Sequence, residues 1–274
     1  APWLLSFDLP FIDTHIDTPA EAAVVVTIGI YALAALFNLR IPDTGARYPG
    51  RTSNPFTLLR IFWHCNLTLW RDPLGQIALA VTTLFWGAGA SLQFLVLKWA
   101  EHQLDMRLDQ ATRLQGVVAL GVALGAVLAA SWVPLRRSLR VLPLGVAMGF
   151  AIMLMTIVHN EAMAMLVLLV IGILSGFFVV PMNALLQHRG YVVMSAGNSI
   201  AVQNFNENLN ILVMLSFYAL MLWLDLPINT VAVLFGLAVA SVMLLVILWH
   251  RRNQRRFDSE VHIGEDPRHG NIPT

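Results

Sequence analysis

Four polar side chains share one face of an otherwise apolar segment, residues 197–223. They follow the spacing i, i+3, i+4 and i+7, which places side chains on one side of an α-helix: Gln203, Asn206, Glu207 and Asn210. Asn204 and Asn208 widen this polar face. The face predicts either the wall of a polar cavity or a hydrogen-bonded seam between helices. The carboxylate favours the cavity, because a seam needs amides but has little use for an acid.

Gln93 is a second isolated polar side chain, in the apolar segment 76–100, where it follows Gly87, Gly89 and Ser91. We expect Gln93 either on the cavity wall opposite Glu207 or as a packing amide between helices. Lys98 lies nearer the end of this segment. It is expected to reach the membrane interface as an anchor.

The segment 162–187 carries residues that suit a hinge: Gly176, Pro181 and Asn183. Pro181 removes one backbone hydrogen bond and can bend a helix. The group predicts either a gate near the cytoplasmic mouth or static packing. Gly121 and Gly125 have the four-residue spacing that is typical of closely packed helices.

Enzyme motifs are incomplete in this sequence. Asp13, His15 and Asp17 alternate like metal ligands but have no further ligand nearby, and the sequence Gly197-Asn198-Ser199 lacks the deep histidine of an intramembrane protease. No glycine-rich phosphate loop is present. We therefore expect no enzyme activity, metal, cofactor or nucleic-acid partner.

The composition is that of a membrane protein. Of 274 residues, 57% are hydrophobic and 12% are charged, whereas soluble domains carry about 25% charged residues. About 20 apolar helical residues span a bilayer, and seven segments have this length: Pro19–Leu39, Gln76–Ala100, Arg113–Val133, Leu139–Val158, Ala162–Gln187, Gly197–Trp223 and Ile228–His250. The sequence predicts an all-α polytopic helical bundle.

Basic residues predict the orientation and the division of the chain. Of the 17 Lys and Arg residues, 14 fall in one set of alternating loops, which the positive-inside rule makes cytoplasmic. The N-terminal residues are then periplasmic and the C-terminus is cytoplasmic. We expect four parts: a periplasmic loop and one helix (1–39), a cytoplasmic loop (40–75), six helices (76–250) and a polar tail (251–274). Within the cytoplasmic loop, residues 54–69 are expected to form either an interfacial helix or a loosely packed linker.

Three stretches resemble the bacterial lysophospholipid transporter family of the major facilitator superfamily: Leu84–Gly89, Gly176–Gln187 and Ala196–Asn208. The resemblance implies a fold of two six-helix halves. The seven predicted helices would be the last helix of the N-terminal half and the whole C-terminal half, with the preceding part missing. The division into one and six helices fits this independently.

The family carries lysophospholipids, chiefly lyso-phosphatidylethanolamine, inward across the bacterial inner membrane. An acyltransferase/acyl-carrier-protein synthetase, expected as a partner in trans, re-acylates them there. Glu207 matches an acidic position of the family's polar cavity, and Gln93 stands where an arginine is expected. Glu207 would then contact the ammonium, with Gln203, Asn206 and Asn210 on phosphate or glycerol oxygens. The alternatives are another carrier of the superfamily, for drugs or small solutes, and a non-transporting scaffold for the acyltransferase.

Overall fold

The computed structural model describes residues 19–41 and 54–256, together with Val261 and Ile263. Within these ranges every regular element is a helix. The chain divides into two units, Ala1–Thr52 and Ser53–Thr274. The first unit has one described helix, α1 (Pro19–Asn38), whose 20 residues extend about 30 Å, the thickness of a bilayer core.

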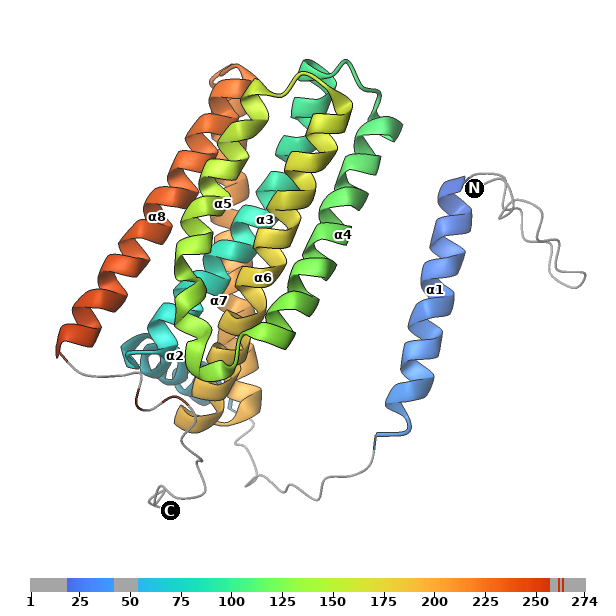
Figure 1. Ribbon diagram of the computed structural model, residues 1–274. Helices are drawn as coiled ribbons and strands as arrows, with labels where there is room; N and C mark the ends of the chain where they lie inside the picture. The colour runs from blue at the N-terminus through green and yellow to red at the C-terminus, as the bar shows by residue number, and fades with distance from the viewer. Residues whose placement is uncertain (1–18, 42–53, 257–260, 262, 264–274) are drawn as a thin grey trace, which may run out of the picture. The chain divides into compact units, whose positions relative to one another are not determined.

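Six helices of the second unit form a bundle of long, roughly aligned rods (Figure 1): α3 (Gly75–Gln103), α4 (Leu108–Trp132), α5 (Leu142–Leu154), α6 (Glu161–Val193), α7 (Ala196–Trp223) and α8 (Ile228–Arg256). Short 3-10 segments, Leu135–Val141 and Met155–Ile157, extend α5 at both ends. The main packing pairs are α4 with α6, α5 with α8, and α3 with α7. The central helices α3 and α6 also contact each other.

Seven segments of the described chain are long and apolar enough to cross a membrane: α1, α3, α4, α6, α7, α8 and Leu135–Ile157. The prediction of an all-α polytopic membrane protein is therefore confirmed. Two predicted helices were too short at one end. α4 begins at Leu108 and α6 continues to Val193, because charged residues end an apolar span without interrupting backbone hydrogen bonds.

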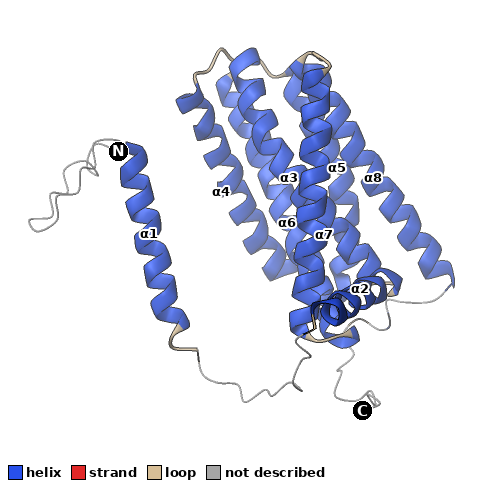
Figure 2. Cartoon of the chain, turned by 180° about the vertical axis from the view of Figure 1, so that it is seen from behind, coloured by secondary structure: helices blue, strands red, loops and turns tan. Residues whose placement is uncertain are grey.

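Helix α2 (Pro55–Arg71) lies across one end of the bundle, beside the beginnings of α3 and α7 (Figures 1 and 2). Asn54 caps it by accepting a hydrogen bond from the Phe56 backbone N–H at 3.0 Å, and a proline follows at the first position, where no amide is needed. Cys65, Asn66 and Leu69 are buried against the bundle. The expected helix over 54–69 is thus present, with one side packed on protein.

Glycines bring α4 and α6 into backbone contact. A Cβ atom added to Gly121 would lie 2.5 Å from the Leu169 carbonyl oxygen, and one added to Gly125 would overlap the carbonyl oxygen of Ile173. On the opposite helix, Gly172 and Gly176 are equally close to α4 backbone. The predicted packing role of Gly121 and Gly125 is confirmed.

Candidate functional site

Gln203 and Glu207 form the centre of the polar face of α7. The Gln203 side-chain amide donates to the Glu207 Oε1 carboxylate oxygen at 2.8 Å and to the Asn183 Oδ1 oxygen at 3.1 Å. Asn183 comes from α6, so the contact joins two helices. Glu207 is 8% exposed and the other two side chains are half-buried. The structure therefore brings Asn183, predicted with the hinge, together with two predicted substrate residues.

The Asn206 side chain forms hydrogen bonds with helix α2. Its side-chain oxygen accepts from the Trp70 indole N–H at 3.1 Å, and its amide donates to the Asn66 Oδ1 oxygen at 2.7 Å. The amide also donates to the Val202 carbonyl one turn earlier. Trp70 in turn stacks on Trp249 of α8. Asn206 thus lies in a seam, the second of the two roles considered for the polar face.

Asn210 holds α7 against α3. Its amide donates to the backbone carbonyl oxygen of Thr83 at 2.8 Å. The amide nitrogen lies within the space that a Gly87 side chain would fill. Gly87 is thus required for the close approach of these two helices, and Asn210, like Asn206, holds helices together.

Gln93 faces α4 rather than α7. Its side-chain amide donates to the Gln115 Oε1 oxygen at 3.3 Å, and the Gln115 amide donates back to the Gln93 backbone carbonyl oxygen at 2.9 Å. Gln93 follows Gly87 by six residues, which turns it by about 120° round the helix. The structure therefore does not bring Gln93 together with Glu207. It places Gln93 in a second, exposed polar contact.

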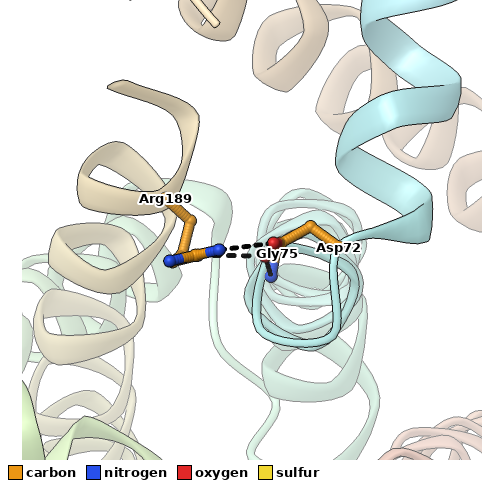
Figure 3. A network of polar contacts seen from close by, with 3 residues as sticks. All are labelled: Asp72, Gly75 and Arg189. Atoms are coloured by element: carbon orange, nitrogen blue, oxygen red, sulfur yellow. Dashed lines mark hydrogen bonds and ion pairs between the residues drawn. The ribbon is translucent and has the colours of Figure 1, made fainter. Parts of the chain in front are cut away.

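A buried ion pair that was not predicted from the sequence closes the end of the bundle near α2. The Arg189 guanidinium of α6 donates to both carboxylate oxygens of Asp72, at 2.5 and 3.0 Å (Figure 3). Asp72 Oδ2 also accepts from the Gly75 backbone N–H at 2.7 Å, at the start of α3. The side chains are about 10% exposed. An arginine followed by glycine at the end of a long apolar segment was the available signal, but its partner lies 117 positions away.

The predicted hinge residues occupy ordinary helix. α6 continues through Pro181 from Glu161 to Val193. Gly176 lies against α4, where a Cβ atom would overlap the Val122 carbonyl oxygen. This gives Gly176 a packing role, and the hinge stays a prediction.

Metal ligands do not gather in the described ranges, where no three His, Cys, Asp or Glu side chains come together. The alternating Asp13, His15 and Asp17 lie outside the described residues, as do the expected periplasmic loop 1–18 and most of the tail. Chemically, the centre of α7 offers one carboxylate and two amides in an apolar surrounding. These groups can bind a cationic or hydroxyl-rich group by charge-assisted hydrogen bonds.

Comparison with known proteins gives a consistent set of relatives. The chain is 38% identical over 225 residues to the lysophospholipid transporter LplT of Escherichia coli O157:H7 (strain EC4115 / EHEC), a match that covers 81% of this chain and 56% of that protein. It is 43% identical over 201 residues to the lysophospholipid transporter LplT of Yersinia enterocolitica serotype O:8, covering 73% of this chain and 50% of that protein.

The transporter of the same name from Escherichia coli O1:K1 is 37% identical over 233 residues, or 84% of this chain and 58% of that protein. The chain therefore spans about half the length of the curated relatives that it matches. No family model matches the chain, and no solved structure does. The identity extends over most of the sequence described above, and on that ground the chain belongs to the family of the lysophospholipid transporter LplT.

Proposed function

We propose that the chain forms the C-terminal half and the preceding helix of a lysophospholipid transporter of the major facilitator superfamily. The full-length protein moves lyso-phosphatidylethanolamine-type lipids inward across the bacterial inner membrane. The observation that carries this proposal is the 37–43% identity to proteins named as lysophospholipid transporters, over 73–84% of the chain. The polar contact in the centre of α7 supports it.

The substrate contact in this proposal is the group Asn183, Gln203 and Glu207. A phosphoethanolamine headgroup carries one ammonium and one phosphate. Glu207 binds the ammonium, because the carboxylate is its natural partner in an apolar surrounding. The Gln203 and Asn183 amides bind phosphate or glycerol oxygens. Asn206 and Asn210 hold α2 and α3 in place around this group.

Major-facilitator carriers place the substrate between two halves, and access alternates between the two sides. We propose that α6 takes part in this change. Asn183 contacts the substrate group, Pro181 lacks one backbone hydrogen bond, and Gly176 allows α6 to slide against α4.

We also propose that the end of the bundle that carries α2 faces the cytoplasm. Arg136, Arg137 and Arg140 lie in the segment Leu135–Val141, whose apolar residues cluster with Cys65 and Leu69 of α2. Lys98 and Arg107 lie toward the other end of α3 and just after it, as the positive-inside rule requires. α2 exposes Phe56, Leu59 and Trp63 on its free side. It therefore lies in the inner-leaflet interface, where an acyltransferase acting in trans receives the delivered lipid.

The direct test is uptake of lyso-phosphatidylethanolamine by the full-length protein in proteoliposomes, with no other protein present. Wild type is expected to transport it. Glu207→Gln is expected to lower transport about tenfold or more, since one charge-assisted hydrogen bond contributes about 1.5–3 kcal/mol. Gln203→Ala should have a similar effect.

Asn204→Ala and Asn208→Ala are the matched controls, because both side chains lie on the same helix and are exposed. They are expected to transport at the wild-type rate. Full activity of both Glu207→Gln and Gln203→Ala would refute the assigned contact. Absence of lysophospholipid transport by wild type, with uptake of a soluble amphiphile instead, would refute the substrate class.

A further inference from the structure

A pocket of about 470 Å³ opens at the end of the bundle opposite α2. Three helices line it: α3 with Phe94 and Leu97, α4 with Ala111, and α7 with Tyr218 and Leu222. Ala111 and Tyr218 are buried, whereas Phe94 is half exposed. Pockets of about 300–1,000 Å³ are typical of small-molecule sites.

Charges stand only at the rim of this pocket. Lys98 Nζ contacts Glu101 Oε2 at 3.0 Å, and Arg107 Nε contacts Asp109 at 3.4 Å. The four side chains are 45–84% exposed. Exposed pairs of this kind are worth about 0–1 kcal/mol. A ligand that brings a phosphate and an ammonium can therefore replace these partners at little cost.

The lining of the pocket combines charged side chains with apolar and aromatic ones. Glu101 lies in the last turn of α3, Arg107 lies just before α4, and Lys98 lies one turn before the end of α3. Phe94 lies one turn before Lys98 on α3, and Leu97 and Tyr218 extend the apolar or aromatic lining. A headgroup at the rim would place its single chain along the apolar wall.

We propose that this pocket is a second lysophospholipid site, which holds a zwitterionic lipid before it reaches the centre of α7. The phosphate is bound by Lys98 and Arg107, the ammonium by Glu101, and the acyl chain by the apolar wall. Tyr218 follows Glu207 by eleven residues, which separates the two sites by about 16 Å along α7. The inference rests on the proposed function, since it takes the substrate class from it.

Simpler occupants are expected to bind less tightly. A free headgroup would gain only the weak rim contacts, and a neutral single-chain amphiphile would leave the rim charges unused. Both parts of the ligand are needed for tight binding.

Cysteine protection in the full-length protein tests this site. Leu97→Cys is introduced into a background with the native cysteines, including Cys65, replaced by serine, and the protein is reconstituted in phosphatidylcholine nanodiscs. The maleimide reaction rate is measured with lyso-phosphatidylethanolamine, glycerophosphoethanolamine, a monoacylglycerol and dioleoyl-phosphatidylethanolamine. Ala90→Cys, two turns earlier on α3, is the matched control. Only lyso-phosphatidylethanolamine is expected to slow the maleimide reaction, and only at position 97.

The rim is tested by Lys98→Gln combined with Arg107→Gln. This variant is expected to weaken the protection by lyso-phosphatidylethanolamine about tenfold in apparent affinity. The control Arg113→Gln removes an exposed charge of α4 that does not line the pocket, and it should change nothing. Equal protection in the rim variant, equal protection by the monoacylglycerol, or protection at Ala90→Cys would overturn the proposal.

Transport measured on the same preparations separates the two claims. Transport without protection at position 97 refutes the second site and leaves the proposed function standing. Protection at position 97 without transport supports the site and refutes the carrier function.

Discussion

Arg189 and Asp72 form an ion pair in which both charged side chains are only about 10% exposed. The guanidinium fork matches the carboxylate, and Asp72 also caps the first turn of α3 through Gly75. Removing one partner of such a pair leaves an uncompensated charge in the interior. The pair therefore fixes the junction between α2 and α3 to the end of α6 (Figure 3).

Arg189→Ala is accordingly expected to lower the free energy of unfolding by about 3–5 kcal/mol. Arg189→Lys should lie between this variant and wild type, because lysine cannot donate two parallel hydrogen bonds from a rigid fork. The measurement is chemical unfolding in detergent micelles. The exposed Arg113→Ala serves as the control and should change stability by about 0.5 kcal/mol or less. A cost for Arg189→Ala no greater than this control would contradict the role given to the pair.

At the scale of helices, glycine position decides how closely two elements pack. Gly125 and Gly176 face the opposing backbone of the α4–α6 pair, whereas Gly89 and Gly116 have open space where a side chain would stand. Replacing glycine by alanine should therefore change the stability of the protein in opposite directions at the two kinds of position.

Gly125→Ala and Gly176→Ala are each expected to destabilise the protein by about 1–3 kcal/mol, because a methyl group there forces the helices apart. Gly89→Ala and Gly116→Ala should stabilise it by up to about 1 kcal/mol, since alanine is the better helix former. Thermal unfolding in one detergent compares all four variants. Destabilisation of equal size at all four positions would show that helix propensity or insertion, rather than packing, controls the effect.

At the scale of the whole molecule, the proposed lipid path depends on which end of the bundle faces the cytoplasm. Asp225 lies in the turn between α7 and α8, close to Asn229, which bonds to Gln103 at the end of α3. Arg137 lies in the segment Leu135–Val141, which packs with α2. The orientation proposed from the basic residues puts Asp225 outside the cell membrane and Arg137 inside.

Asp225→Cys is therefore expected to react with a membrane-impermeant maleimide in spheroplasts, and Arg137→Cys only after the membrane is permeabilised. The native Cys65 is buried and is replaced by serine in both variants. The reverse labelling pattern would show that the bundle has the opposite orientation, with the pocket rim in the cytoplasmic leaflet.

Much of the fold could be predicted from the order of residues. Apolar runs of spanning length are local, and in a bilayer every backbone amide must bond within its own segment, so such runs become helices. The seven spans follow from this rule. The helix after Asn54 was expected instead from its mixture of apolar residues with Arg60 and His64. The polar face of α7 was predicted equally well, because helical periodicity depends on only a few consecutive residues.

Tertiary structure alone decided what those polar residues contact. Asn206 bonds to α2 from 136–140 positions away, Asn210 to α3, and Gln203 to Asn183 of α6. Gln93 turned toward Gln115 because Gly87, and not Gln93, faces α7. Periodicity specifies the side of a helix on which a residue lies, whereas the packing of distant helices specifies its neighbour. For this reason the sequence by itself determined a bundle of membrane helices with a polar face, and the packing decided which amides hold the bundle together and which surround Glu207.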